Sequence, residues 1–430
     1  GQKVMEKIIA IIFTVVAIYT LQYTKKIIFL LACNYILTLL MTWFGMDFGI
    51  NMLFATVYPS DIICFILLFL MFALLLRGKN FNYGLYSYKY VKAPERKFFV
   101  LFAMFAVYSA GLGAVIYGMT SIYLGDIRRF AYFLVPVLFF SYYPIDLSSM
   151  RVKKTIKYTM NLLLIFCYLY WIIFFLTGYT FESIEASMRC ISSDAAYVLA
   201  IYAIYLVYRD LIDGEKKILS IRTLLYIIAI LIIQFNSAYM TFFSGLIVMI
   251  IFNWKKIIKV NTKGLVQLLF LCVAVLIIIK IFGSGDLLQS VSKTFAKFNQ
   301  AVSGDAEGTI GGRYQIWKLV LSTLRGPIQW LSGQPMGTGY HVLYRGGIWE
   351  VSPHSGYIEC LMKTGIVGIV LLIIPIIVLF VKGIKKRRVI LSSFIIGTMF
   401  YWYPYTFTLE AGAIIGNIMW YMYNDSEVFK

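Results

Sequence analysis

The sequence predicts an all-α protein: a polytopic bundle of about 12 to 13 transmembrane helices, with one large external loop that contains short helices. The chain is 61% hydrophobic and only 14% charged, whereas soluble domains average roughly 25% charged residues. Apolar runs of about 17 to 25 residues recur along its whole length, and such runs suffice for helices to cross about 30 Å of hydrocarbon. The alternating ten-residue segments of a membrane β-barrel are absent from the sequence.

The apolar runs define the expected spans in order. They lie near 8–23, 27–44, 62–76, 98–116, 130–145, 158–176, 194–208, 222–236, 238–254, 264–282, 356–381, 389–403 and 411–423. Lys25 and Lys26, not a small-residue cleavage site, follow the first run, so it does not read as a cleaved signal peptide. Which side of the membrane holds the N-terminus stays open.

The distribution of Lys and Arg predicts the orientation of the other loops. Most of the basic loop residues fall in one alternating set, 77–97, 151–157, 209–222, 255–263 and 382–388, which we assign to the cytoplasm. The loops 177–193 and 283–354 then lie outside. This bias explains the net charge of +19 without a nucleic-acid partner. The Cys residues form no CxxC pair, so the sequence does not indicate a zinc site or a disulfide framework.

Three regions follow from this layout. Residues 1–282 form an N-terminal transmembrane bundle, 283–354 a large external loop, and 355–430 the C-terminal transmembrane helices. Within the loop, we expect an amphipathic interfacial helix over 287–301. A second helix should begin near Arg313 and end at Gly326-Pro327, before a turn-rich stretch.

Two residues of the external loop stand out chemically. Arg313 at the start of a helix predicts an anion site, because helix N–H groups and a guanidinium both attract phosphate. His354 follows Pro353 and precedes a span, and an imidazole can accept a proton near neutral pH. The alternatives are a lipid-phosphate contact for Arg313 and a capping role for His354.

Other external cations join them. Arg189 is the basic residue of the 177–193 loop, where an ion pair with Glu185 is the competing interpretation. Arg128 and Arg129 are paired cations on the side where basic residues are disfavoured. They indicate either an anionic partner or simple headgroup contacts.

Residues 311–368 resemble the superfamily of O-antigen ligases and Wzy-type polysaccharide (O-antigen or capsule) polymerases. The similarity rests on a Gly-Arg pair, a Trp four residues later, a Gly-x-Gly turn, and a His followed by Gly-x-x-Gly. In this sequence these are Gly312, Arg313, Trp317, Gly337, Gly339, His354, Gly365 and Gly368. The many spans and the single large loop resemble the family as well.

The resemblance implies a GT-C-like helical fold in the bacterial inner membrane, with the catalytic loop on the periplasmic side. It implies an inverting, metal-independent and cofactor-free glycan transfer from an undecaprenyl diphosphate carrier to an acceptor hydroxyl. Arg189 and Arg313 would bind the diphosphate, with Arg313 and His354 catalytic and His354 the base. The implied partners are the carrier-linked oligosaccharide, the bilayer and a chain-length regulator protein.

Further substrate contacts are expected from a wider set of residues, namely Arg128, Arg129, Arg345, Trp317, Tyr340, His341 and Lys363. Lys363 stands where the family often has an acid. This change adds a cation near the carrier, and a reaction step that depends on the acid would lack it. The family's mid-chain Ser-Arg-Gly is also missing: the chain reads Asn236-Ser237-Ala238-Tyr239.

Three functions remain open at this point. A polymerase extends a carrier-linked chain, and the divergent, Ile/Phe/Tyr-rich composition favours this interpretation. A ligase would move the finished glycan onto a lipid A-core acceptor. A transporter or flippase without chemistry is disfavoured, because transporters concentrate charges at mid-membrane and not in one external loop.

Overall fold

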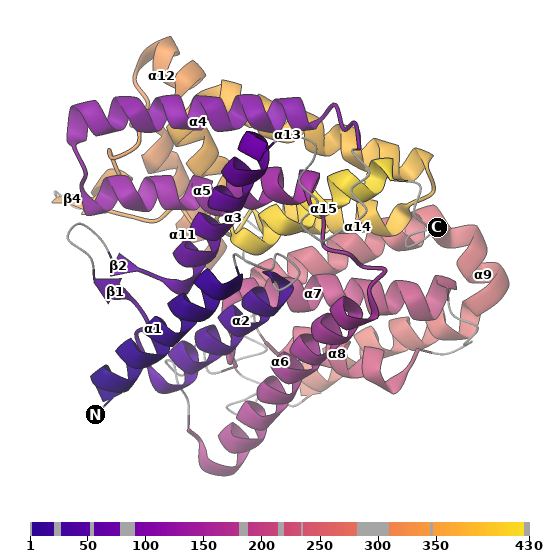
Figure 1. The fold of residues 1–430 in the computed structure, drawn as a ribbon. Helices are drawn as coiled ribbons and strands as arrows, with labels where there is room; N and C mark the ends of the chain where they lie inside the picture. Colours follow the sequence, from indigo (N-terminus) through magenta and orange to yellow (C-terminus); the bar gives the residue numbers. More distant parts are fainter. Residues whose placement is uncertain are drawn as a thin grey trace.

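The computed structural model describes residues 2–20, 27–51, 56–77, 91–179, 188–213, 219–233, 235–281, 309–344 and 347–424. These residues form a helical bundle (Figure 1). Its N-terminal and central helices are α1 (Gln2–Thr20), α2 (Ile27–Phe44), α3 (Pro59–Arg77), α4 (Arg96–Tyr117), α5 (Ser121–Tyr142), α6 (Met150–Thr177), α7 (Ser193–Tyr208), η4 (Arg209–Asp213), α8 (Ile221–Ile232) and α9 (Asn236–Ile281). The remaining helices are α11 (Thr309–Leu321), α12 (Gly326–Ser332), α13 (Gly356–Lys385), α14 (Val389–Tyr401) and α15 (Leu409–Tyr423).

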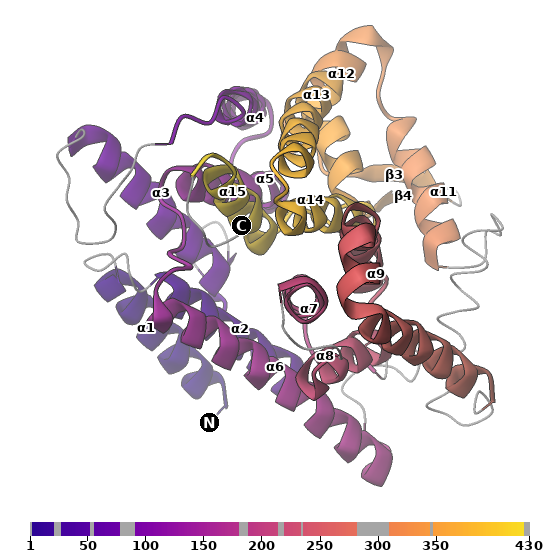
Figure 2. The ribbon, with the colours of Figure 1, turned by 90° about the vertical axis from the view of Figure 1, so that its right-hand side faces the viewer.

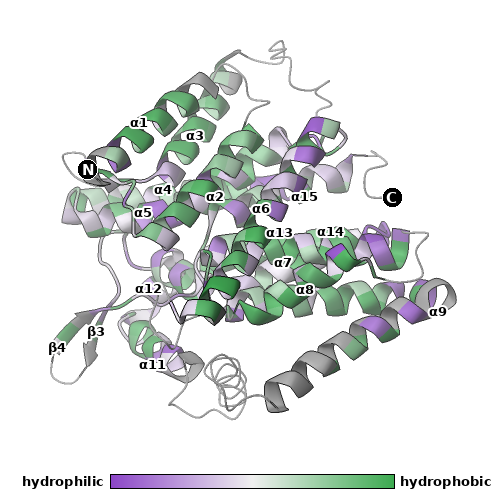
Figure 3. Cartoon of the chain, turned by 90° about the horizontal axis from the view of Figure 1, so that it is seen from below, coloured by the Kyte–Doolittle hydropathy of each residue, from purple (hydrophilic) through white to green (hydrophobic). Residues whose placement is uncertain are grey.

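The all-α polytopic prediction is confirmed. Among the described residues, six helices are long and apolar enough to cross a membrane: α2, α4, α6, α7 extended by η4, the first part of α9, and α13. Hydrophobic residues dominate most helices in Figure 3, and many large apolar side chains are exposed along them, as a lipid-facing surface requires.

The helix α7 forms the centre of the bundle. It is seen nearly end-on in Figure 2, with α6, α8, α9 and α14 around it. Most of its side chains are buried, including Tyr197 and Leu199. The C-terminal helices pack into this bundle, since α14 contacts α9 and α15 contacts α5. The predicted 1–282 and 355–430 regions therefore share one core.

Two small antiparallel hairpins accompany the helices. β1 (Ile50–Asn51) pairs with β2 (Thr56–Val57), and β3 (His341–Tyr344) pairs with β4 (Gly347–Glu350) in the register His341 to Glu350. The second hairpin projects from the bundle close to α11 (Figure 3). It occupies much of the stretch that the sequence predicted as turns.

Some predicted boundaries were wrong. The two spans at 238–254 and 264–282 are one 46-residue helix, α9. No Pro interrupts it, and the Lys residues of the expected loop are good helix formers. Helix α5 begins at Ser121, capped by the Thr120 hydroxyl, which accepts from the Tyr123 amide. Arg128 and Arg129 therefore lie in a helix and not in the loop 117–129.

The external loop also differs from its prediction. Gly326-Pro327 begins α12 and does not end α11, because Pro is well suited to the first helical turn, where no backbone donor is needed. Helix α11 already ends at Leu321. The amphipathic helix expected over 287–301 lies outside the described residues.

Candidate functional site around His354

His354 sits at the entrance to α13. Its side chain is exposed, and its φ of +45° is in the left-handed region, which few residues other than Gly adopt. Two residues later the Gly356 amide donates to the carbonyl oxygens of Trp402 and Tyr405, at 2.9 and 2.8 Å. The segment that holds His354 is thus tied to the loop between α14 and α15.

Trp317 fixes the same segment from the other side. This side chain of α11 is buried, and its indole N–H donates to the carbonyl oxygen of Pro353 at 2.5 Å. The ring packs edge-on against Tyr403, with 5.2 Å between centroids. Trp317 is therefore placed to position the residue before His354, and little of it is open to a substrate.

Arg313 lies one turn inside α11 and not at its first residue. Its guanidinium is partly buried, and Nη1 donates to the carbonyl oxygen of Pro404 at 2.5 Å. Since the amide of Arg313 lies within the helix, any anion affinity comes from the side chain and not from the helix terminus. The same α14–α15 loop thus anchors both Arg313 and the His354 segment.

Arg189 brings a second guanidinium to this place. Its side chain lies over the Phe235 ring, with 5.0 Å from Cζ to the ring centroid. Its buried Nε has no hydrogen-bond partner within the described part of the chain. Burial, and then the charge of Arg189, lower the pKa of Arg313. The two cations are therefore close neighbours, and the described residues form no ion pair with either.

The electrostatic environment of His354 suits a base. Although part of its surface is exposed, the surrounding protein removes water from His354 and so lowers its pKa from the usual 6.5, and the positive charges of Arg313 and Arg129 lower it further. The imidazole is consequently neutral at pH 7 and has a lone pair for a proton.

A buried ion pair lies behind this surface. Lys363 Nζ is 2.7 Å from Asp126 Oδ2, and both side chains are almost fully buried. Lys363 also donates to Thr338 Oγ1 at 2.6 Å and to the Gly339 carbonyl at 3.0 Å. The Gly337 amide donates to Asp126 at 2.8 Å. This network explains the Gly-x-Gly turn, since Gly337 and Gly339 have φ of +101° and +67°.

Lys363 was expected to contact the substrate, and the structure shows this side chain buried. Its charge is neutralised by an acid of α5, 237 residues earlier in the chain, and its side chain has no exposed surface. The cation at the family's acidic position and the acid of α5 form one structural unit.

A second buried acid pairs with Arg129. Arg129 Nη1 is 3.8 Å from Glu359 Oε1 and 4.0 Å from Asp126. Its Cζ lies 5.0 Å from the centre of the Tyr340 ring, which is itself buried. The Thr406 hydroxyl donates to Glu359. Arg129 therefore links the buried charges to the His354 surface.

The remaining expected contacts are dispersed. Arg128 pairs with Asp61 at 2.8 Å and donates to the Thr56 carbonyl, so it holds the start of α3 to α5. His341 is exposed at the start of β3. Arg345 lies outside the described residues. The structure thus gathers Arg189, Arg313, Arg129 and His354, and places Arg128 in a separate ion pair.

The Gly-x-x-Gly motif has a packing role. Gly365 has φ of +63° and divides α13 into two helical parts. A Cβ there would lie 2.2 Å from the Leu331 carbonyl oxygen, at the end of α12. A Cβ at Gly368 would meet Thr364 and Phe102. These glycines let α12 and α4 approach the kinked helix.

Asp126 and Glu359 are functional candidates that no sequence motif pointed to. The available signal was the position of the two acids, since carboxylates within apolar helices are costly and need cations beside them. Across the described ranges, no cluster of three or more His, Cys, Asp or Glu side chains could hold a metal ion.

Comparison with known proteins agrees with this geometry. Residues 221–373 match the family model described as O-antigen ligase. The match extends from α8 into α13 and includes Arg313, Trp317, His354 and Lys363, whereas Arg129 and Arg189 precede it. The search of curated proteins gives no match. The resemblance to the O-antigen ligase superfamily is confirmed.

Proposed function

We propose that this chain, which matches the O-antigen ligase family model over residues 221–373, is a polysaccharide polymerase of the bacterial inner membrane. It transfers a glycan from undecaprenyl diphosphate to an acceptor hydroxyl of another carrier-linked repeat unit, on the outer side of the membrane. The observation that carries the proposal is the pair Arg189 and Arg313, which have no ion-pair partner in the described ranges, beside an exposed and neutral His354.

The chemistry follows from these three side chains. The acceptor oxygen forms a bond to the anomeric carbon, while the bond from that carbon to the diphosphate oxygen breaks. His354 takes the acceptor proton, and the electron pair of the broken bond leaves with undecaprenyl diphosphate. Guanidinium groups match phosphate oxygens through two parallel hydrogen bonds, so Arg189 and Arg313 stabilise the charge that develops on the leaving group. Attack opposite the leaving group inverts the anomeric centre.

Arg129 is a third cation for the same substrate. Its ion pairs with Glu359 and Asp126 are long, at 3.8 and 4.0 Å, and its Nη1 has no hydrogen bond among the described residues. It lowers the pKa of His354 and so lies within electrostatic reach of the base. We assign Arg129 to the phosphate of the diphosphate that carries the sugar.

The second candidate is a ligase, favoured by the description of the matching family model. Purified protein given carrier-linked repeats alone distinguishes the two. Chain growth without another acceptor supports the polymerase, whereas transfer that requires a lipid A-core acceptor supports the ligase. Polymer synthesis that persists in His354→Ala would contradict both and leave transport or a structural role.

A further inference from the structure

A cavity lies apart from the His354 site. It has a volume of about 510 Å³ and lies between α2, α6, α7, α14 and α15. Sites for small ligands usually occupy about 300 to 1,000 Å³. None of Arg189, Arg313 and His354 lines this cavity, so it serves a different ligand or a different part of one.

The cavity is long and mostly apolar. Its lining includes both Glu410 and Tyr421 of α15, which are separated by about 16 Å along a helix that rises 1.5 Å per residue. Apolar side chains such as Leu31, Ile201 and Phe394 form most of the wall. A slot of this shape and chemistry fits a single extended hydrocarbon chain.

The basic residues of the lining gather at one end. Tyr421 donates to the Ile145 carbonyl at 2.7 Å and accepts from the Leu147 amide at 2.9 Å, so the end of α15 lies beside the chain that leads into α6. Lys153 and Lys157 line the cavity one helical turn apart on the same face of α6. Asn161, one turn further, accepts from Arg222. Four cations thus line one edge, namely Lys153, Lys157, Arg209 and Arg222.

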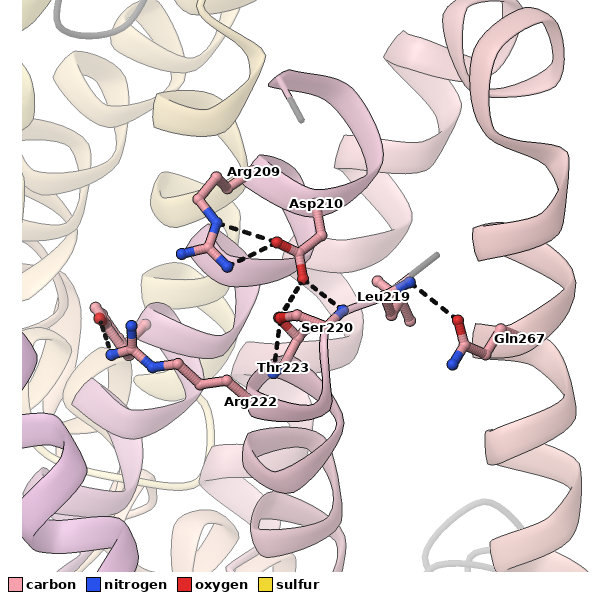
Figure 4. Close-up of polar contacts among 8 residues, drawn as sticks. Arg209, Asp210, Leu219, Ser220, Arg222, Thr223 and Gln267 are labelled. Carbon is pink, nitrogen blue, oxygen red and sulfur yellow. Dashed lines mark hydrogen bonds and ion pairs between the residues drawn. The ribbon is translucent and has the colours of Figure 1, made fainter. Parts of the chain in front are cut away.

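Arg222 is a cation of this edge that has no ion-pair partner among the described residues. The neighbouring Arg209 is neutralised by Asp210, at 2.7 Å. Asp210 also accepts from the Ser220 amide and hydroxyl and from Thr223, and so holds the start of α8 (Figure 4). Arg222 points away from this carboxylate (Figure 4). Its Nη2 donates only to the neutral oxygens of Asn161 and Tyr202.

Arg222 has a hydrogen-bond donor that the described residues leave without a partner. Its Nε is buried and has no hydrogen-bond partner among the described residues, which also form no ion pair with it. A phosphate oxygen would satisfy this donor and neutralise the charge. Lys153 and Lys157 are exposed, so they can meet the same headgroup from the water side.

We propose that this cavity binds one acyl chain of an anionic membrane phospholipid, whose phosphate is held by Arg222 with Lys153 and Lys157. The basic ends of α6, α7 and α8 belong to the loops that the positive-inside rule assigns to the cytoplasm. The headgroup therefore belongs to the inner leaflet, where anionic lipids attract basic segments. This assignment is independent of the transfer reaction at His354.

Native mass spectrometry of the full chain in detergent tests the proposal. We expect one tightly bound phosphatidylglycerol per chain and weaker binding of phosphatidylethanolamine, whose headgroup carries no net charge. Arg222→Gln should weaken phosphatidylglycerol binding about tenfold, since it removes a charge-assisted hydrogen bond. Lys157→Gln, a surface change that leaves the bundle intact, should weaken it by a smaller factor.

Two further variants complete the design. Lys154→Gln removes an exposed cation beside Lys153 that does not line the cavity, and it should leave binding unchanged. Ala32→Phe fills the slot from α2 and should displace both lipids. Equal phosphatidylglycerol binding by the wild type, Arg222→Gln and Lys157→Gln would overturn the proposal. Displacement of phosphatidylglycerol by less undecaprenyl phosphate would also overturn it, because the occupant would then be the carrier.

Discussion

Trp317 donates its indole N–H to the carbonyl oxygen of Pro353, the residue directly before His354. The family motif places this Trp four residues after Arg313, on the next turn of α11. One helix therefore carries both Arg313 and the donor that holds the residue before His354. The fixed spacing between the two residues follows from this helical geometry.

Trp317→Phe should separate the hydrogen bond that positions the His354 segment from the ring contact with Tyr403. An aromatic ring still packs on Tyr403, but the smaller phenyl group has no N–H, so the Pro353 carbonyl loses its donor, at a cost of about 1–3 kcal/mol in stability. We expect transfer to fall by about tenfold or more, mostly in kcat, because a displaced base loses its alignment. Steady-state kinetics and thermal unfolding measure the two effects. Trp330→Phe, an exposed Trp of α12, is the matched control and should change neither.

Arg313→Gln should raise the pKa of His354. The charge of Arg313 lowers that pKa, so its removal brings the value back toward 6.5, and the imidazole stays protonated to a higher pH. The chain has only two His, so His341→Gln leaves one imidazole to follow by NMR titration without any need for activity. Arg325→Gln removes an exposed cation that does not contribute to this shift. If Arg313→Gln leaves the pKa of His354 unchanged, as Arg325→Gln should, Arg313 and His354 do not share a site.

Lys363→Met should be strongly destabilising. It leaves the Asp126 carboxylate buried without its closest cation, and breaking a buried pair on one side costs about 3–5 kcal/mol. Adding Asp126→Asn removes the unpaired charge and should recover most of the loss. Thermal unfolding of the two single variants and the double variant gives the coupling energy. If the stability losses of the two single variants simply add in the double variant, the two side chains do not act as a pair.

The sequence allowed prediction of the features that depend on local periodicity. The span at 27–44 coincides with α2, and most other spans differ from their helices by a few residues. Features that depend on distant contacts were not predictable in this way. Asp126 and Lys363 are 237 residues apart, and no local pattern pairs them. The burial of Tyr340 between Arg129 and Lys363 likewise follows from packing alone.

The site shows the same division. The motif identified Arg313, Trp317 and His354, but it did not distinguish a positioning Trp from one that contacts the substrate. The bond from Trp317 to Pro353 and the burial of the indole favour a positioning role. Arg128 and Arg129 are adjacent in sequence, yet the helix turns one toward Asp61 and the other toward Glu359. Successive helical residues point about 100° apart, which separates their roles.

Gly365→Ala should disturb the site through α12. Its φ of +63° disfavours any side chain, and a Cβ would meet the carbonyl of Leu331. The strain costs about 1–3 kcal/mol before any steric effect. The displaced kink would move Lys363 and Thr364, whose backbone lies against Gly333 of the α12 terminus. We therefore expect a lower melting temperature together with reduced transfer.

Gly111→Ala is the control for this glycine. Gly111 lies inside α4 and has nothing within 4 Å of an added Cβ. Ala is the better helix former by about 1 kcal/mol, so this variant should be neutral or slightly more stable. An equal loss of stability in both variants would mean that α4 tolerates no added methyl group. A Gly365→Ala protein that unfolds at the same temperature as the wild type would show that the backbone conformation of Gly365 is not required.

Arg313→Lys and Arg189→Lys address the charge of the site directly. A Lys keeps the positive charge but replaces the planar fork with a single ammonium, which does not reproduce two parallel bonds to phosphate oxygens. We expect each variant to insert normally and to lose transfer by at least about a hundredfold, close to the Ala variants, since an oriented donor to developing charge accounts for about 10²–10³ in rate. Polymer length on gels and initial rates with carrier-linked repeats measure this loss. Arg128→Lys is the matched control, because its ion pair with Asp61 tolerates an ammonium and lies apart from His354. Full activity in both Lys variants would show that charge alone suffices, and a normal polymer in both Ala variants would remove the two Arg from the diphosphate site.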